Sequence, residues 1–515
     1  MARLKTHDYQ TETIEKVLAE PTRAALIGEG VGRGKTLCAT EIVLAGGWKR
    51  VLFIGIAETF DQWKATIEGQ SAGAASIRRL DSTKAGKQVY ADFLAGEDGF
   101  FFATIHWLMR QDFAYRDKLD FEGNPIEKID KKTGMLTGKF EREKVHLKTF
   151  DKMCRRKRGG LDAVVFDEAH AVSNRKSTGR TTLLSFRGRL LEDGEHEQMW
   201  KIALSATWAG NSFENAWSLT RWLWPTLIPA FWNWHDEWCE VEKVYIPGRS
   251  DPVPRVVGEK EPGAFVKTLP CYVANGATEE APEATVIHVD PTPQQEAQMQ
   301  DLKRDLMTWV ETDGGEHPLV VDVPGALYAR FKQLALAELT IGADGESVEF
   351  APGAASAKLR ALKGILDHWG AQPVVLLTDS KLFANLATDR MRAAGYNAVA
   401  WTGDVPRKER ERIKQAFIAG EYQYLVGTVQ AMGTGLDGLQ AVCSKIVWLN
   451  KPDGDPKLEI QARGRILRQG MTKKYGEFEE VVLVQNESHD TKILETLLAK
   501  AETLRASIGK EALAA

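Results

Sequence analysis

The sequence contains few of the features that mark a secreted or membrane-bound protein. Its 515 residues include only five cysteines, which are odd in number and nowhere spaced as metal ligands. That pattern is typical of buried thiols in a reducing compartment, so we expect neither disulfides nor zinc. No stretch approaches the ~20 apolar residues that span a bilayer, and the first residues form no apolar signal region. We therefore expect a cytoplasmic protein with no membrane partner.

A strong charge of either sign is also missing. The formal net charge is -4, so binding to nucleic acid cannot be inferred from the overall charge and must come from local patches. One such patch runs from Lys128 to Arg158, where twelve Lys and Arg residues face four Asp and Glu residues. This stretch is either a phosphate-binding segment or a solvated loop, and the sequence leaves both interpretations open.

Short apolar runs separated by helical stretches recur through the first 210 residues. Strands of this length that are hydrophobic on both faces, and that alternate with helices, predict a parallel sheet covered on both sides. The runs are Ala24–Ile27, Val51–Ile56, Phe100–Ile105, Ala163–Phe166 and Ile202–Leu204. They predict a first α/β lobe.

A second series of such runs predicts a second α/β lobe: Val374–Leu377, Ala398–Ala400, Tyr424–Gly427, Lys445–Leu449 and Val481–Val484. The expected fold is α/β, with two parallel-sheet lobes in tandem over residues 1–226 and 356–515. Residues 227–355 contain Pro/Gly-rich pieces and one probable helix, 294–308, so we predict a mainly helical insertion and interlobe connection there. A smaller irregular, basic insertion is expected at about residues 111–160.

The segment Gly28-Glu-Gly-Val-Gly-Arg-Gly-Lys-Thr36 lies between a predicted strand and a predicted helix. A phosphate loop needs this context, because its backbone N–H groups and the helix N-terminus point at the anion. Gly32 and Gly34 shape the turn, Lys35 is expected to reach the outer phosphates, and Thr36 is expected to bind Mg²⁺. The segment predicts a site for ATP with Mg²⁺.

Two carboxylates follow the run Ala163–Phe166, at the predicted carboxyl end of a strand, where ligand sites open in parallel sheets. Asp167 is predicted to hold Mg²⁺, partly through water, and Glu168 to orient and deprotonate the attacking water. Ser205-Ala-Thr207 closes another strand and places Ser205 and Thr207 near the nucleotide site. By itself this tripeptide is a weak signal.

Two arginines near the C-terminus, Arg465 and Arg468, lie three residues apart. On a helix they project from one face, and opposite a γ-phosphate they would act as arginine fingers. Gln461 is expected on the same helix, as a nucleotide-side partner.

These residues form an ordered set that resembles the motifs of superfamily-two helicases. The set comprises Tyr9-Gln10, Gly32-Arg-Gly-Lys-Thr36, Asp167-Glu-Ala-His170, Ser205-Ala-Thr207, Gly433-Thr-Gly-Leu436 and Gln461–Arg468. Within that superfamily the chain most resembles the Swi/Snf-type DNA-translocating ATPases. The segment 205–219, Trp224-Pro225, Ala357-Lys-Leu359 and Trp401-Thr-Gly-Asp404 carry this second resemblance.

The resemblance implies two RecA-like lobes, and it implies that Gln10 reads the adenine edge. It also implies that His170, Ser205, Thr207, Gly433 and Gly435 couple hydrolysis to a bound nucleic-acid backbone. The expected partner is DNA, double-stranded, with replication, recombination or phage proteins as further candidates. Because the chain has no room for large accessory domains, the resemblance indicates a compact bacterial or phage enzyme, in a bacterial or phage-infected cell.

The sequence therefore predicts an ATP-dependent DNA translocase. A strand-separating or branch-migrating helicase shares every catalytic residue and differs by a wedge, which sequence does not reveal. An RNA helicase is a third hypothesis, although the Asp-Glu-Ala-Asp box usual in that group is absent. From another class, a nucleotide-gated scaffold in a nucleic-acid complex stays open.

Overall fold

The fold was determined as a computed structural model. It describes residues 3–508 except for 121, 123, 130–132, 134, 155–159, 176–198, 210–211, 246–250, 275–281, 306, 313–314, 321–323, 343, 345–346, 351–352, 434–437, 454–455 and 469. The chain divides into two compact units. The first comprises Met1–Glu29 and Gly34–Gly276, and the second comprises Gly30–Arg33 and Ala277–Ala515. Among the described residues, no helix is both long enough and apolar enough to cross a bilayer.

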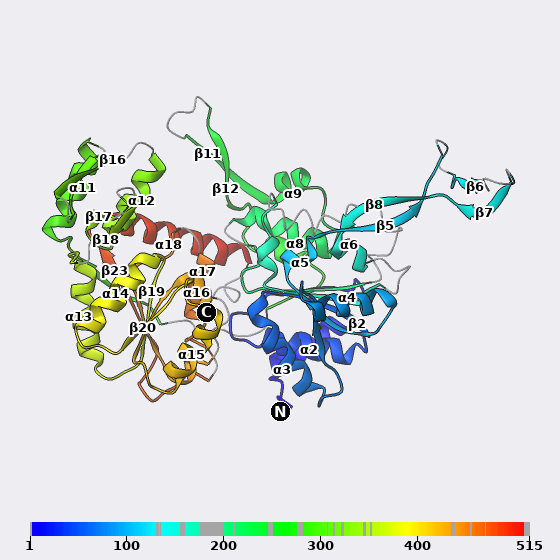
Figure 1. The fold of residues 1–515 in the computed structure, drawn as a ribbon, viewed down its shortest axis with the longest axis horizontal. Coiled ribbons are helices and arrows are strands. Elements are labelled where there is room, and N and C mark those ends of the chain that lie inside the picture. The colour runs from blue at the N-terminus through cyan, green and yellow to red at the C-terminus, as the bar shows by residue number, and fades with distance from the viewer. Residues whose placement is uncertain are drawn as a thin grey trace. The chain divides into compact units, whose positions relative to one another are not determined.

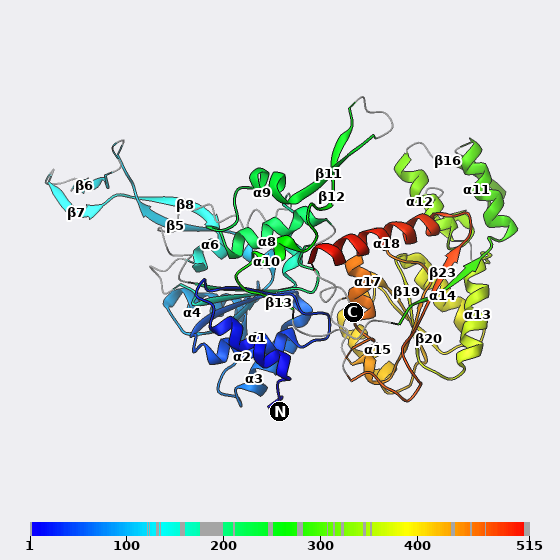
Figure 2. The ribbon, with the colours of Figure 1, turned by 180° about the vertical axis from the view of Figure 1, so that it is seen from behind.

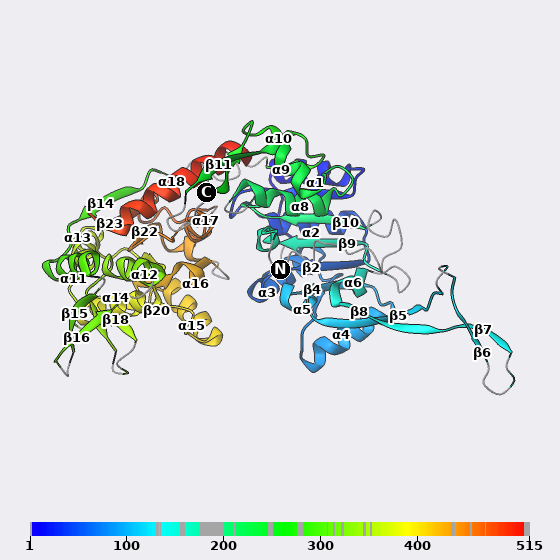
Figure 3. The same cartoon turned by 90° about the horizontal axis from the view of Figure 1, so that it is seen from above.

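The first unit is built on a seven-stranded sheet whose strands all run parallel (Figure 3). Its order is β13 (Tyr272–Val273), β1 (Ala24–Ile27), β10 (Trp200–Leu204), β9 (Ala163–Asp167), β2 (Arg50–Ile54), β4 (Gly99–Ala103) and β3 (Ile77–Arg79). All five predicted strands of this lobe are confirmed. The four central strands β1, β10, β9 and β2 consist of buried residues almost throughout, as expected for a sheet covered on both faces.

Helices cover both faces of this sheet. Figure 2 shows α2 (Lys35–Ala45) and α3 (Phe60–Gln70) on one face and α8 (Ala216–Leu223) on the other. Elsewhere in the described part of this unit the α-helices are α1 (Asp8–Leu18), α4 (Lys84–Ala95), α5 (Ile105–Leu108), α6 (Thr149–Cys154), α9 (Phe231–Trp238) and α10 (Ala264–Lys267). Tryptophans in and around α8 and α9 contribute to the hydrophobic core of the first unit. Trp208, Trp217, Trp222, Trp224 and Trp234 are buried, whereas Trp232 is exposed.

The second unit contains a six-stranded sheet, also entirely parallel. Its order is β14 (Thr285–Val289), β23 (Glu479–Gln485), β22 (Lys445–Trp448), β19 (Val374–Thr378), β21 (Tyr424–Thr428) and β20 (Ala398–Trp401). The five strands predicted for this lobe are confirmed. Along β19 alternate residues belong to two different hydrophobic clusters, so each face of the sheet has its own core.

Eight helices accompany this sheet in the part of the chain that the structure describes: α11 (Pro293–Asp305), α12 (Pro324–Leu334), α13 (Ala357–Trp369), α14 (Lys381–Ala393), α15 (Arg407–Ile418), α16 (Val429–Gly433), α17 (Pro456–Arg463) and α18 (His489–Ile508). The predicted helix 294–308 is confirmed as α11, although it ends earlier, at Asp305.

A mainly helical insertion over 227–355 is not what the structure shows. Besides its helices, this region contains three antiparallel hairpins: β11 (Cys239–Val244) with β12 (Val253–Glu259), β15 (Met307–Thr312) with β16 (Gly315–Val320), and β17 (Leu339–Ile341) with β18 (Val348–Phe350). Two further strands of the region, β13 and β14, join the edges of the two parallel sheets. Strand β13 has only two residues and therefore gives no periodic signal in the sequence.

The segment expected to be an irregular insertion contains a two-stranded ribbon. Strand β5 (Gln111–Asp117) pairs antiparallel with β8 (Arg142–Lys148), and β6 (Glu127–Ile129) pairs with β7 (Leu136–Phe140) farther out. The ribbon extends from the first unit, with β6 and β7 at its far end (Figure 1). The basic run 155–158 at the end of the predicted patch lies outside the described residues.

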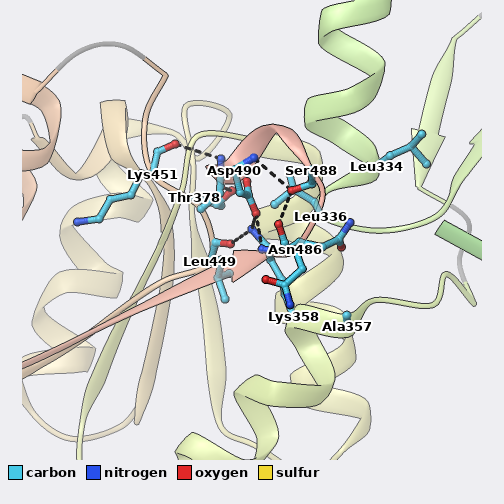
Figure 4. Close-up of polar contacts among 12 residues, drawn as sticks. Leu334, Leu336, Ala357, Lys358, Thr378, Leu449, Lys451, Asn486, Ser488 and Asp490 are labelled. Atoms are coloured by element: carbon cyan, nitrogen blue, oxygen red, sulfur yellow. Dashed lines mark hydrogen bonds and ion pairs between the residues drawn. The ribbon is translucent and has the colours of Figure 1, made fainter. Parts of the chain in front are cut away.

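A buried polar network joins elements of the second unit (Figure 4). The Lys358 ammonium forms an ion pair with Asp490 and donates to the backbone oxygen of Leu449 at 2.7 Å. Asp490 in turn accepts a hydrogen bond from the Gln485 backbone N–H at 3.0 Å. Because the Lys358 side chain is fully buried, the pair must satisfy its charge, and it fixes α13, β23 and α18 to one another.

Candidate functional site

Three adjacent strands of the first sheet end at the predicted site. The sheet order β1-β10-β9 places the phosphate loop, Ser205-Ala-Thr207 and Asp167-Glu168 after the carboxyl ends of neighbouring parallel strands. Carboxyl ends of parallel strands meet at one edge of a sheet, which is where ligand sites form. The topology therefore brings together motifs that lie between residues 28 and 207.

The loop after β1 has a backbone that glycine alone accommodates well. Gly32 and Gly34 adopt φ angles of +79° and +74°, and Gly34 is the N-cap of α2. A Cβ on Gly34 would lie 2.5 Å from the Gln10 amide nitrogen, so Gln10 also needs glycine there. The Gln10 side chain is buried, and its oxygen accepts the His7 backbone N–H at 3.0 Å. Gln10 thus lies against the loop.

Lys35 is the first residue of α2, and its ammonium donates to the Glu29 backbone oxygen at 2.8 Å. Burial lowers the Lys35 pKa, whereas the charges of Glu168 and Asp167 act in the opposite direction. Lysine, both carboxylates and the helix N-terminus are therefore electrostatically coupled in one place. Such a helix N-terminus with an adjacent ammonium is suited to a phosphate anion.

Asp167 is held by a partner that the sequence analysis missed. The indole N–H of Trp63, a buried residue of α3, donates to Asp167 Oδ2 at 3.0 Å. The Glu168 backbone N–H donates to Oδ1 at 3.0 Å. Burial and the neighbouring Glu168 charge raise the Asp167 pKa to about 6, although these hydrogen bonds and Lys35 oppose the rise. Trp63 belongs to none of the motifs identified in the sequence, so no sequence pattern connected it to Asp167.

Glu168 begins a chain of polar contacts that reaches β10. Its backbone is left-handed, with φ +49°, which is uncommon for a residue with a side chain and typical of functional sites. The His170 Nδ1 lies 3.2 Å from Glu168 Oε2 and 3.1 Å from Ser205 Oγ. Ser205 Oγ also accepts the Thr207 backbone N–H at 3.2 Å. The predicted coupling residues His170, Ser205 and Thr207 thus form one connected group.

The side chains present fit Mg²⁺ delivered with a nucleotide. Mg²⁺ prefers oxygen ligands and is usually bound by one or two carboxylates together with substrate phosphates. Among the described residues, no cluster of three or more His, Cys, Asp or Glu side chains could hold a metal. Asp167, with its raised pKa, is a carboxylate whose charge a cation would stabilise. Asp167 and the Thr36 hydroxyl are the side-chain oxygens that would hold such an ion.

The predicted second-unit residues are placed differently from the expectation. Helix α17 ends at Arg463, so Gln461 lies on it, but Arg465 and Arg468 lie in the turns beyond. The prediction that a helix aligns the two arginines is wrong. Gly464 disfavours a helix. After it the backbone forms a turn, in which the Arg465 N–H donates to the Ala462 oxygen, three residues back, at 3.2 Å. Gly433 is the last residue of α16, and Gly435 lies outside the described residues.

A second residue that the sequence analysis missed is Tyr272, on strand β13. A Cβ on Gly28 would lie 2.6 Å from the Tyr272 ring, so this ring packs against the start of the phosphate loop. The Tyr272 backbone oxygen accepts the Lys16 ammonium at 2.9 Å. Sequence analysis had assigned position 272 to the interlobe region, because a two-residue strand gives no periodic signal.

Comparison with known proteins supports this architecture. Residues 357–470 match the family model of the helicase conserved C-terminal domain. Among solved structures, Saccharomyces cerevisiae Dbp5 bound to RNA and ADP BeF3 is similar with a TM-score of 0.50 and 12% identity, over 96% of this chain and 88% of that chain. A point variant of Dbp5 with the same ligands gives 0.49 and 13% over the same shares. No curated protein sequence matches the chain.

These findings define an α/β protein with two RecA-like lobes. Residues 357–470, which match the helicase C-terminal family model, lie in the second of these lobes.

Proposed function

We propose that the protein is a nucleic-acid-stimulated ATPase of the helicase type, and that it uses ATP hydrolysis to move along duplex DNA. The observation that carries the ATPase proposal is the connected group at the carboxyl ends of β1, β9 and β10. In this group Lys35, Asp167 and Glu168 are electrostatically coupled, and His170 links Glu168 to Ser205.

Hydrolysis then follows from the positions of these side chains. Lys35 and the N-terminus of α2 would bind the outer phosphates, and Thr36 and Asp167 would hold Mg²⁺, which would supply positive charge to the phosphate oxygens. Glu168 accepts the proton of the attacking water. His170 and Ser205 hold Glu168 in its left-handed conformation and transmit its state to β10.

In this proposal Arg465 and Arg468 complete the charge stabilisation from the second lobe, and Gln461 and Gln10 contribute to nucleotide binding. The two arginines lie in a turn region after α17, a location where a backbone adjusts more readily than in a helix. Gly433 and Gly435 are proposed to couple this lobe to the nucleic acid.

Duplex DNA as the track is supported by the resemblance to Swi/Snf-type enzymes, and RNA is the competing track. Dbp5, a protein of similar fold, is bound to RNA in the structures compared. The chain differs from the Asp-Glu-Ala-Asp pattern at His170, where the imidazole makes the contact to Ser205. We therefore favour DNA.

The test is phosphate release by the full chain with Mg²⁺-ATP, measured with blunt duplex DNA, single-stranded DNA, forked DNA and structured RNA. We expect the largest stimulation with duplex DNA and displacement of a third strand from a triplex. If RNA stimulates phosphate release and none of the DNAs does, the track is RNA rather than DNA. Nucleotide binding without stimulated turnover by any of these would support a nucleotide-gated scaffold instead.

A further inference from the structure

The ribbon formed by β5, β8, β6 and β7 exposes an unusual number of apolar side chains. Of fourteen large hydrophobic side chains that are exposed in the described part of the chain, five lie between residues 119 and 140. They are Leu119, Ile129, Met135, Leu136 and Phe140, with exposed fractions of 51, 62, 71, 66 and 44%. Such a concentration marks an interaction surface rather than chance exposure.

Strand pairing arranges three of these side chains on one face of the outer ribbon. The pairing of β6 with β7 is irregular between Glu127 and Ile129, and Gly138 in β7 has φ +70°, so the shared face follows from the paired residues. Glu127 and Ile129 are two residues apart on β6 and point to the same side, and Glu127 is directly opposite Phe140. Ile129 on β6 is paired directly with Leu136, and directly opposed residues of antiparallel strands share a face. Ile129, Leu136 and Phe140, which we term the apolar face, therefore lie together.

The opposite face of the same ribbon is cationic. Lys128 and Lys139 alternate with the apolar residues and are exposed, and neither forms an ion pair with any residue that the structure describes. The nearby carboxylates are engaged otherwise: Glu141 pairs with Lys118 at 3.3 Å, and Glu127 accepts the Gly138 backbone N–H. The ribbon thus presents Lys128 and Lys139 on one side, and on the other the three apolar side chains together with Glu127, whose carboxylate accepts the Gly138 backbone N–H.

A DNA fork or junction offers both an apolar surface and phosphates, which are the chemical partners of these two faces. Along an intact duplex, stacked neighbours cover the flat faces of base pairs, and phosphates dominate the outside. At a fork or junction, the last base pair exposes an apolar face beside the phosphates of a departing strand. Apolar side chains are known to insert at base steps, and aromatic ones stack on bases.

We propose that the outer ribbon binds DNA forks: the apolar face covers the last base pair, and Lys128 and Lys139 contact the phosphates of the departing strand. The inference rests on the proposed function, because it assumes that nucleic acid is the track, and it deepens that function by naming the DNA structure that the enzyme engages.

The test is equilibrium binding of the full chain, without ATP, to a forked and a blunt DNA duplex of equal length. Two variants are compared with the wild type. One combines Ile129→Ser, Leu136→Ser and Phe140→Ser, and the other, a matched change on the opposite face, combines Lys128→Ala and Lys139→Ala. All five side chains are exposed, so both variants should keep the wild-type unfolding temperature.

The wild type is expected to prefer the fork, and the serine variant to lose that preference by a factor on the order of ten while binding blunt DNA normally. The lysine variant is expected to bind the fork more weakly, with a slope of log affinity against log salt reduced by about two. Equal wild-type affinity for both DNAs, or a preference retained by the serine variant, would overturn the proposal. Unchanged DNA binding by both variants would overturn it as well and would indicate a protein partner for the apolar face.

ATP hydrolysis stimulated by long blunt DNA is measured on the same samples. Its absence from the wild type would count against the proposed motor function alone, because fork preference is measured without ATP.

Discussion

The two units treat buried carboxylates in opposite ways. In the first unit, burial and Glu168 raise the Asp167 pKa to about 6, and the nearby Lys35 has a lowered pKa because of its own burial. In the second unit, burial alone would raise the Glu480 pKa, but Lys451 at 3.0 Å and Arg463 at 3.1 Å outweigh it and hold that pKa below its ordinary value. The negative charge at Asp167 and Glu168 is thus poorly compensated, whereas that of Glu480 is neutralised by Lys451 and Arg463.

This difference separates a reactive site from a structural one. An incompletely compensated carboxylate pair destabilises the folded chain but is ready to receive a cation and a substrate. The Glu480 network, which also includes Glu459, has its cations built in and ties α17 to β23. Changes in the first unit should therefore reduce activity, and changes in this network should reduce stability.

The largest effect on ATP turnover is expected from Arg465 and Arg468, two residues of the second unit outside the Glu480 network. Arg465→Ala and Arg468→Ala should each reduce ATP turnover by ~10³-fold or more, the usual contribution of an arginine finger, while ATP binding persists. Turnover and nucleotide binding measured on the same protein check this. Arg412→Ala, at an exposed ion pair with Glu409, is the control. Normal turnover in both finger variants would mean that the second unit has no catalytic cation there.

Removing the Glu480 charge tests whether its network serves stability rather than activity. Glu480→Gln leaves Lys451 and Arg463 near an uncharged group and should destabilise the fold by ~3–5 kcal/mol, as measured by denaturant unfolding. Turnover per folded molecule should stay within about threefold of the wild type. A large loss of turnover with normal stability would assign this network to catalysis.

The same network predicts a pH dependence of stability. The folded-state pKa of Glu480 is depressed, so its contribution is complete above the unfolded-state pKa of about 4.3 and is lost as pH falls through the lower folded-state value. The difference in unfolding free energy between the wild type and Glu480→Gln should therefore shrink below about pH 4. A constant difference down to pH 2 would contradict the assignment.

Trp63→Phe tests the support of Asp167 in the first unit. The ring volume is mostly kept, but the hydrogen bond to the carboxylate is lost, which is worth ~1.5–3 kcal/mol for a charged acceptor. Because an unanchored carboxylate binds a cation less well, we expect the Mg²⁺ concentration for half-maximal ATPase activity to rise by about tenfold. Trp107→Phe, in the same unit, is the control. An unchanged Mg²⁺ requirement would show that the contact is only packing.

A smaller effect is expected from Ser205→Ala, which leaves His170 in contact with Glu168. The loss of one hydrogen bond, ~1 kcal/mol, should reduce nucleic-acid stimulation by about fivefold, with basal turnover little changed. Basal and stimulated rates measured together check this. Equal reductions in both would place Ser205 in chemistry rather than in coupling.

Sequence reasoning recovered the parts of the fold that carry strong local signals. Buried parallel strands such as Val374–Thr378 are continuous apolar runs, and the phosphate loop has glycines that its backbone requires. Contacts between distant segments left no such signal. The Trp63–Asp167 bond spans 104 positions, and strand β13 has only two residues. The end of α17 at Arg463 was missed because regular spacing of arginines was taken as evidence of helix despite Gly464.

The alternation on the outer ribbon was visible in the sequence but too short to interpret. Strands β6 and β7 have three and five residues, and lysines alternating with apolar residues also fit a solvated loop. The pairing of Ile129 with Leu136 and of Glu127 with Phe140 shows that the apolar residues share a face.

The most direct measurement compares Glu168→Gln with the wild type in single-turnover ATP hydrolysis, with ATP affinity determined on the same samples. The account predicts that ATP affinity stays within about threefold, while the rate of hydrolysis falls by ~10²- to 10⁴-fold because the proton acceptor is lost. Hydrolysis at the wild-type rate by a fully folded Glu168→Gln protein would contradict the assignment of catalysis to the first unit.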